Sequence, residues 1–221
     1  MSHSRASSSS GNAVEDRAVA SLTWARENLT AVIIGAVVVV AGIVGISVAR
    51  RSAAIKETRA EQALFAAQQS FTAGNLPLAQ SDLQKMLARY DGTRAADQAS
   101  LLLAQIHYQA GQVDSGLVLL GKMTSAGPEG AAVDALRAAG LETQNKLDDA
   151  AAAYQAAAQK AGAGSVADGY RAEAARVLAT AGKKDEALAI WRELANDEES
   201  FYAAEAHVRI GELTATVAGT N

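Results

Sequence analysis

Residues 28–49 form a run without a charged side chain, in a chain of which 20% of residues are charged. From Ala31 to Ala49, the one polar side chain is that of Ser47. Because an α-helix rises about 1.5 Å per residue, about 20 residues cover the roughly 30 Å hydrocarbon core of a bilayer. The run therefore predicts a single transmembrane helix over residues 29–49.

A cleaved signal peptide is the alternative interpretation of this run. The apolar core of a signal peptide usually has about 7–15 residues and ends in a small-residue cleavage site. Here the apolar run is longer, and Arg50 and Arg51 follow it directly. These features favour an uncleaved single span.

The basic residues that flank the span favour one orientation. Two precede it and four follow it: Arg17 and Arg26, then Arg50, Arg51, Lys56 and Arg59. Basic residues are enriched on the cytoplasmic side of membrane proteins. By this rule, the modest imbalance would place the C-terminal domain in the cytoplasm.

The segment before the span, residues 1–28, is expected to be disordered or to form only a short helix. Met1 to Asn12 is rich in serine and nearly free of large apolar side chains, so it cannot bury enough surface to become ordered. Val14 to Asn28 could form a short helix that leads into the membrane. The segment after the span, residues 50–221, is long enough for one domain with a sizeable core.

The composition restricts what this domain can be. The net charge of −4, with basic residues dispersed along the chain, argues against a nucleic-acid partner. The chain has no cysteine, which excludes disulfides and thiolate metal sites. Two prolines, many alanines and no sustained alternation of polar and apolar residues predict an all-α fold.

A helix-breaking turn recurs four times in the domain. The turns centre on Gly74, Gly111, Asn145 and Gly182, which are 37, 34 and 37 positions apart. Glycine and asparagine tolerate the left-handed conformation that ends many helices. Small residues recur seven positions before and five positions after each centre: Ala67, Ala104, Ala138 and Ala175, then Ala79, Gly116, Ala150 and Ala187. The pattern predicts four hairpins whose two helices cross at close range.

This pattern resembles the tetratricopeptide repeat, which has a period of about 34 residues. Nine positions after each turn lies a large residue that would fill the core between hairpins: Leu83, Leu120, Tyr154 and Trp191. Pro128 lies where that family usually ends a repeat. The resemblance covers about residues 60–196 and implies a solenoid of about four helical hairpins.

Two features predict how the solenoid begins and ends. There is no glycine or proline from Ile46 to Ala73, so the membrane helix is expected to continue unbroken into the first repeat helix. A last helix, from about Ser200 to Thr216, is expected to cover the apolar face of the final repeat. Solenoids need such a cap because each repeat leaves an apolar face uncovered.

Few residues in the sequence suggest catalysis. His107 has no second histidine or carboxylate at helical metal-site spacing, so we interpret it as a structural histidine. Three carboxylate groups lie at or near predicted helix N-termini, where they interact favourably with the helix dipole: Asp148-Asp149, Asp185-Glu186 and Asp197-Glu198-Glu199. No phosphate-binding loop, nucleophile motif or zinc motif occurs. We therefore expect no enzyme activity, cofactor, metal or small-molecule substrate.

Protein binding is the function that remains. The resemblance implies that the first helix of each hairpin lines a concave groove that holds segments of other proteins. On this sequence the groove residues would be Leu64, Gln68, Phe71, Leu101, Gln105, Tyr108, Gln109, Glu142 and Arg176. Arg176 is the one cation among them, so an apolar or weakly polar partner segment is expected. The alternative is that these side chains pack against a neighbouring helix or the C-terminal cap.

The layout also resembles a bacterial family, the YfgM-like ancillary subunit of the Sec translocon. The shared features are an N-terminal segment with acidic and aromatic residues (Glu15-Asp16 to Trp24), one span and a degenerate repeat domain. The resemblance implies a single-pass inner-membrane protein with a periplasmic repeat domain. Its partners would be translocon subunits, a membrane-anchored folding helper and unfolded secretory proteins. The alternative is a scaffold or adaptor that faces the cytoplasm, or belongs to an envelope assembly, and binds folded partners.

Overall fold

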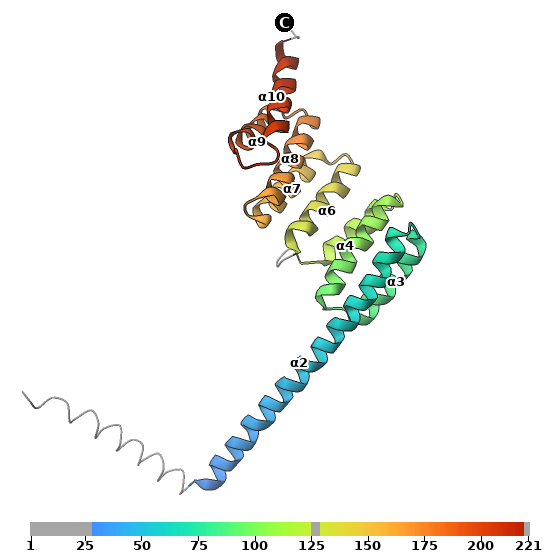
Figure 1. Ribbon diagram of the computed structural model, residues 1–221, viewed down its shortest axis with the longest axis vertical. Helices are drawn as coiled ribbons and strands as arrows, with labels where there is room; N and C mark the ends of the chain where they lie inside the picture. The colour runs from blue at the N-terminus through green and yellow to red at the C-terminus, as the bar shows by residue number, and fades with distance from the viewer. Residues whose placement is uncertain (1–27, 125–128, 219–221) are drawn as a thin grey trace, which may run out of the picture. The chain divides into compact units, whose positions relative to one another are not determined.

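The computed structural model describes residues 28–124 and 129–218, and this part of the chain is helical apart from turns. Its helices, shown in Figure 1, are α2 (Leu29–Thr72), α3 (Leu76–Tyr90), α4 (Arg94–Gln109), α5 (Val113–Lys122), α6 (Gly130–Thr143), α7 (Leu147–Ala161), α8 (Ser165–Thr180), α9 (Lys184–Asn196) and α10 (Ala203–Ala218). The described ranges contain no strand, so the predicted all-α fold is confirmed. Pro128 and the predicted helix that starts at Val14 lie outside them.

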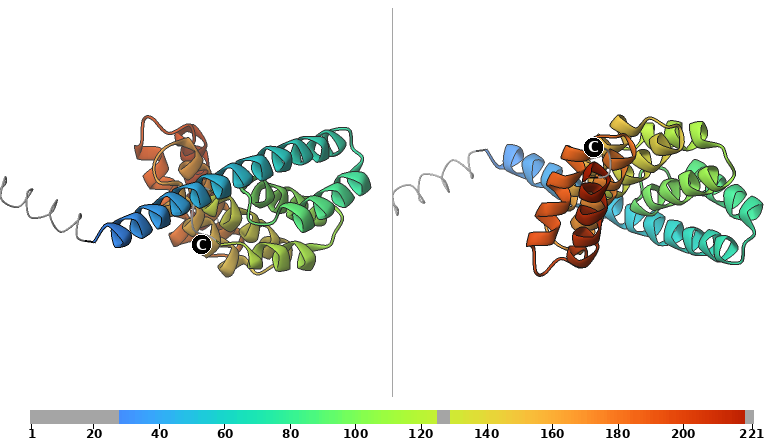
Figure 2. Two further views of the ribbon diagram at one scale, coloured as in Figure 1. Left: turned by 90° about the horizontal axis from the view of Figure 1, so that it is seen from below. Right: turned by 90° about the horizontal axis from the view of Figure 1, so that it is seen from above.

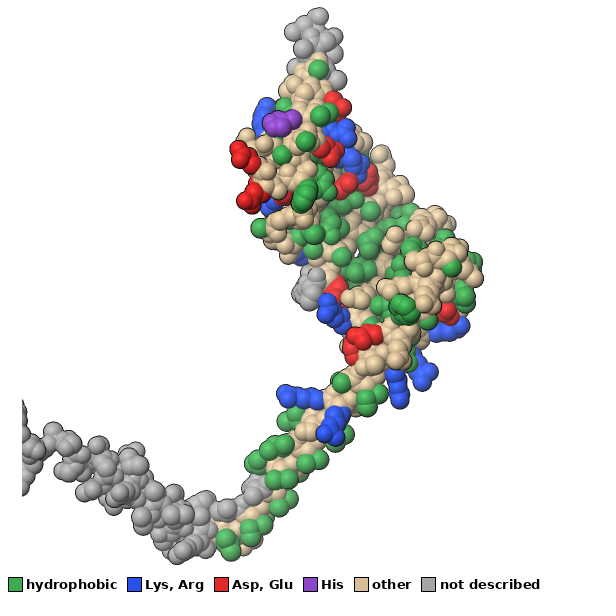
Figure 3. Space-filling view, in the orientation of Figure 1, with side chains coloured by type: hydrophobic (Ala, Val, Ile, Leu, Met, Phe, Trp, Pro, Cys, Tyr) green, Lys and Arg blue, Asp and Glu red, His purple; other side chains and the backbone are tan. Residues whose placement is uncertain are grey.

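The chain divides into two compact units, one up to Ile55 and one from Lys56 onward. In the first unit, the large apolar side chains described between Leu29 and Val48 each expose 54–64% of their surface. Figure 3 shows hydrophobic side chains along this part of α2. Of the helices described, α2 alone is long and apolar enough to cross a membrane. An exposed apolar surface of this extent indicates contact with lipid or with another protein.

Helix α2 continues without a break to Thr72, as the absence of glycine and proline after Ile46 predicts. In the second unit its character changes, because Ala60, Leu64 and Ala67 are buried. Their spacing of four and three residues places them on one face of the helix. The helix is therefore apolar as far as Ala49, before Arg50 and Arg51, and amphipathic in the second unit.

The four predicted turns all have the expected backbone conformation. The φ angles at Gly74, Gly111, Asn145 and Gly182 are +76°, +74°, +58° and +81°. In each turn, the N–H of the next residue donates to the carbonyl oxygen five positions back: Asn75 to Ser70 (2.9 Å), Gln112 to His107 (2.8 Å), Lys146 to Leu141 (2.9 Å) and Lys183 to Leu178 (2.9 Å). This is the Schellman pattern, which satisfies carbonyl groups at a helix end. The turn prediction is confirmed at all four positions.

The predicted crossing points are buried without exception. The seven alanines at these points are fully buried, and Gly116 is buried as well: Ala67, Ala104, Ala138, Ala175, Ala79, Ala150 and Ala187. The four large residues nine positions after the turns are also buried, with exposed fractions from 0% to 7%: Leu83, Leu120, Tyr154 and Trp191. A larger side chain at a crossing point would push the two helix axes apart. Figure 2 shows the resulting succession of helical hairpins in two further views.

The buried apolar residues of the second unit form two clusters. One joins α2, α3 and α4 and includes Leu83 and Ile106. The other joins α6 to α10 and includes Trp191, the largest fully buried side chain described. In a solenoid each repeat contacts only its neighbours. The buried residues can therefore form successive clusters along the stack in place of one central core.

The last helix, α10, covers the end of the stack. Ala206 is fully buried, and Tyr202, Ile210 and Leu213 pack on the second cluster. The helix begins at Ala203 rather than at Ser200, because a turn precedes it in which the Ala203 N–H donates to the Ser200 carbonyl at 3.1 Å. The predicted cap is therefore present, about three residues later than expected.

Candidate protein-binding cleft

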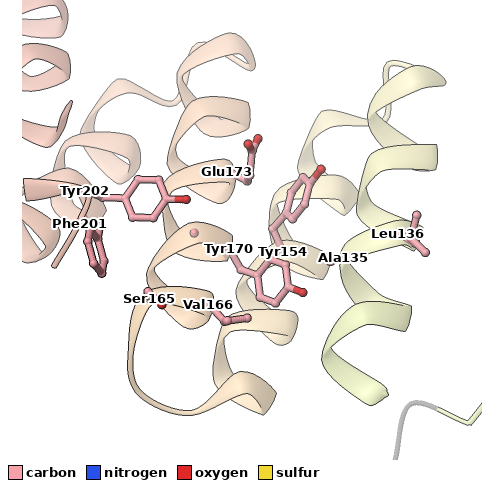
Figure 4. Close-up of a pocket in the computed structure, with 10 residues that line it drawn as sticks. Ala135, Leu136, Tyr154, Ser165, Val166, Tyr170, Glu173, Phe201 and Tyr202 are labelled. Carbon is pink, nitrogen blue, oxygen red and sulfur yellow. The ribbon is translucent and has the colours of Figure 1, made fainter. Parts of the chain in front are cut away.

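A cleft of the repeat domain lies across one face of α8. It has a volume of about 710 Å³ and is lined by Ala135, Leu136, Tyr154, Ser165, Val166, Gly169, Tyr170, Glu173, Phe201 and Tyr202. These residues come from α6, α7, α8 and the turn before α10. Figure 4 shows the rings of Tyr154 and Tyr170 between α6 and α8, with Phe201 and Tyr202 extending from the turn beside α8.

Aromatic side chains are concentrated in this cleft. The whole chain has five tyrosines and three phenylalanines, and Tyr154, Tyr170, Phe201 and Tyr202 line the cleft. Phe201 is 86% exposed, and Val166 is 62% exposed. Phenylalanine is a side chain that folding normally buries. Its exposure beside three tyrosines makes this face a candidate surface for contact with another molecule.

Gly169 allows one of these rings to approach α8. A Cβ atom at position 169 would lie 3.0 Å from the hydroxyl oxygen of Tyr202. A larger residue there would displace the Tyr202 ring. The lack of a side chain at Gly169 therefore shapes one wall of the cleft.

A three-residue ionic network lies at the edge of the cleft. Both carboxylate oxygens of Glu142 accept hydrogen bonds from Arg176, at 2.8 and 2.7 Å, and Glu173 accepts one from Arg176 Nε at 2.8 Å. Two carboxylates on one guanidinium are a geometry that arginine favours. The hydrogen bonds with Glu142 are the largest cause that raises the pKa of Arg176, and the hydrogen bond with Glu173 raises it further. The network joins α6 to α8 across one repeat.

The tetratricopeptide repeat-like domain family matches this chain over residues 23–131 and 56–171. The chain belongs to the tetratricopeptide repeat-like domain family. Repeats of this fold are generally protein-interaction modules.

Solved structures confirm the fold of this tetratricopeptide repeat-like protein. TPR-like repeats of a putative kinesin light chain from Podosopora anserina, and a point variant of them, superpose with a TM-score of 0.60 at 14% identity, covering 74% of this chain and 89% of that one. A tetratricopeptide repeat protein from Parabacteroides merdae gives a TM-score of 0.59 at 12% identity, covering 72% of this chain and 61% of that one. At these identities the likeness concerns the fold alone. A search of curated protein sequences gave no match.

None of the nine groove residues predicted from the sequence lines the cleft of this repeat protein. Leu64 is buried in the first core cluster, where Phe71 also packs, and Leu101 and Tyr108 are partly buried. Gln68, Gln105 and Gln109 are exposed. Glu142 and Arg176 bind each other. Leu64 and Phe71 thus pack in the core, as the alternative interpretation of the groove residues expects. The exposed side chains of Gln68, Gln105 and Gln109 leave the predicted groove as a second candidate surface.

The sequence contained one signal for the cleft that the repeat pattern does not use. Phe201 and Tyr202 are adjacent aromatic residues in the segment between the last repeat and the cap. They fall outside the repeat register, so mapping repeat positions misses them. Tyr170 lies on α8 twelve positions before the Gly182 turn, where the other repeats have Gln62, Ala99 and Val133.

The described histidines occupy structural or exposed places. His107 Nδ1 lies 2.8 Å from Gln112 Oε1, across the turn that follows α4. His207 is exposed on α10. No group of three or more histidine, aspartate or glutamate side chains that could hold a metal ion occurs within residues 28–124 and 129–218.

Tyr108 occupies a tight slot between hairpins, and its ionisation gives a test of the structure. Its hydroxyl donates to the Leu136 carbonyl at 3.1 Å. Burial raises the pKa of Tyr108 to about 12, against a smaller lowering by Arg137, and burial likewise raises the pKa of Tyr154 to about 12. In the unfolded chain both groups ionise near pH 10.

We expect the protein to lose stability as the pH rises from about 10 to 12, because the unfolded state releases these protons first. Below pH 10 these two groups should have no effect on the pH dependence. Denaturant unfolding across this range, with tyrosinate absorbance as a second readout, checks the prediction. The Tyr108→Phe variant should show a weaker loss. Titration of all five tyrosines near pH 10 in the folded protein would contradict it.

Proposed function

We propose that this protein is a membrane-anchored protein-binding module. The observation that supports it is the pairing, in one chain, of an apolar helix exposed on all sides with a repeat domain that carries an open aromatic cleft. The helix would hold the domain at the membrane, and the cleft would hold segments of other proteins. Tethering raises the effective concentration of such a site near the membrane, so weak contacts suffice. We expect binding of isolated segments at micromolar affinity or weaker.

We further propose the periplasmic side of a bacterial inner membrane as the place of the repeat domain. There it would associate with translocon subunits and a membrane-anchored folding helper, and receive unfolded secretory proteins as they emerge. The layout of an acidic and aromatic leader, one span and a degenerate repeat domain supports this proposal. The second candidate is a scaffold or adaptor that faces the cytoplasm or belongs to an envelope assembly. The four basic residues after the span favour that candidate.

A topology experiment separates the two candidates. A compartment-sensitive reporter is fused after Asn221, and protease access to the repeat domain is compared in intact and permeabilised cells. We expect the reporter to be active in the periplasm and the domain to be cleaved once the outer barrier is opened. A cytoplasmic reporter signal would overturn the translocon proposal and leave the adaptor.

A crosslinking experiment then tests client capture. A photoreactive amino acid at position 201 should crosslink to a secretory chain arrested during export, because Phe201 is 86% exposed in the cleft. Position 65 is the matched control, because Phe65 is 62% exposed but lies on α2 and does not line the cleft. A crosslink to one folded partner in place of the arrested chain would favour the assembly role.

A further inference from the structure

The charges around the aromatic cleft are unevenly distributed. Glu173 is the one charged side chain among the described residues that line it. Arg176 contacts Glu173 but is also bound through both terminal nitrogens by Glu142. One guanidinium thus faces two carboxylates, which leaves the network with a net negative charge at the edge of the cleft.

The other cations of α6, α7 and α8 are bound to two buried carboxylates. Arg137 and Lys160 both bind Asp134, and Arg171 binds Asp168 at 2.6 Å. Asp134 and Asp168 are buried, whereas none of the three cations lines the cleft. Arg137 and Lys160 share one carboxylate, so that trio has a net positive charge, but it lies outside the lining of the cleft.

The segment that supplies two of the aromatic rings is acidic. Between Arg192 and Arg209 the sequence has five carboxylates and no lysine or arginine: Glu193, Asp197, Glu198, Glu199 and Glu205. Glu205 pairs with Arg209 at 3.3 Å. Asp197, Glu198 and Glu199 are exposed and directly precede Ser200 and Phe201. The exposed segment that leads into Phe201 therefore carries the same sign of charge as Glu173.

Aromatic faces reinforce this preference for a cation. The face of a tyrosine or phenylalanine ring attracts ammonium and guanidinium groups within about 6 Å. Four such rings line the cleft with a carboxylate among them. At Tyr154, burial is the main cause that raises the pKa of the hydroxyl; Glu142 and Glu173 raise it further, and Arg176 lowers it by less than either.

We propose that the cleft binds a basic side chain, arginine or lysine, from an extended segment of a partner protein. The cationic group would lie beside Glu173, and the carbon chain behind it would lie against Tyr170, Tyr202 and Phe201. Apolar neighbours in the segment would contact Leu136 and Val166. This inference rests on the proposed protein-binding function and specifies the chemistry of the partner.

Three synthetic peptides test the inference on the full chain in detergent micelles. They share one sequence of alanine and leucine and differ at its centre, which holds arginine, glutamine or glutamate. We expect the arginine peptide to bind roughly five- to tenfold more tightly than the glutamine peptide, in keeping with one cation–π and charge contact. The glutamate peptide should bind more weakly still, and added salt should reduce the difference.

Matched variants locate the site. Glu173→Gln should remove the preference for arginine while leaving the glutamine peptide unaffected, and Phe201→Ala should weaken binding of all three peptides. Glu61→Gln and Phe65→Ala, at exposed positions on α2, are the controls. They should change neither the preference for the arginine peptide nor the affinity for the three peptides. Circular dichroism of each variant checks that the fold is retained.

Each result has a distinct meaning. Equal binding of the three peptides, or a preference for glutamate, with loss on Phe201→Ala would overturn the basic-partner inference and leave the protein-binding function standing. If the Phe201→Ala variant binds the peptides as the unaltered protein does and the Gln105→Ala variant does not bind them, the site lies in the predicted groove. That result would also overturn the inference. If no peptide binds while position 201 crosslinks to an arrested chain, the inference fails alone. If neither occurs, both proposals fail.

Discussion

Replacing Trp191 with alanine is expected to lower the free energy of unfolding by about 3–5 kcal/mol. Trp191 is 1% exposed and is the largest side chain in the core cluster that joins α6 to α10. Removing it deletes most of its apolar contacts and leaves a cavity that helices crossing at small residues cannot readily close. A domain of this size is typically stable by about 5–15 kcal/mol, so the loss is a large part of the total.

The loss should be uneven along the chain, because repeats are stabilised mainly by their neighbours. Hydrogen exchange should show reduced protection in α8, α9 and α10, with a smaller change in α3 and α4. Denaturant unfolding of the full chain in micelles measures the total. Phe201→Ala is the control, since Phe201 is 86% exposed and its loss should cost about 0.5 kcal/mol or less. Equal loss of protection in α3 and α9 would show instead that the domain unfolds as one cooperative unit.

Replacing Gly140 with valine is expected to lower the free energy of unfolding by about 2–3 kcal/mol, through overpacking. Even a Cβ at Gly140 would lie 2.8 Å from Tyr108 Cζ and 2.9 Å from Leu117 Cδ2. Substituting a glycine in a helix normally gains up to about 1 kcal/mol of helix propensity. The steric cost exceeds that gain, because the Tyr108 ring also packs closely against Gly116 and its hydroxyl is bound to the Leu136 carbonyl, so it has little room to move.

A double-mutant cycle identifies the cause. Tyr108→Ala removes the ring that valine would meet, so the double variant should lose less than the sum of the two single variants. Gly121→Val is the matched control, because Gly121 lies in helix α5 and a Cβ there meets nothing within 4 Å. It should change the stability only slightly. Strict additivity in the cycle would show that Tyr108 is not what restricts position 140.

The turns, the crossing points and the core-filling residues were all predictable from the sequence. Each depends on a property of a residue type at a fixed local distance: a positive φ at Gly111 or Asn145, or a small side chain at Ala104 and Ala150. The apolar helix was predictable for a similar reason, since length and lack of charge are properties of the chain itself. Such features are set within one hairpin and do not depend on how the hairpins stack.

The cleft was decided by the tertiary structure. It combines residues of α6, α7, α8 and the turn before α10, so its location depends on how successive hairpins pack against one another. Phe201 and Tyr202 reach it because a turn lies between α9 and α10 and because Gly169 leaves room for a ring. The slot of Tyr108 between Gly116 and Gly140 has the same origin, as two of its walls come from different repeats. Sequence spacing specifies the hairpin, whereas contacts between side chains of separate hairpins specify which surface remains open.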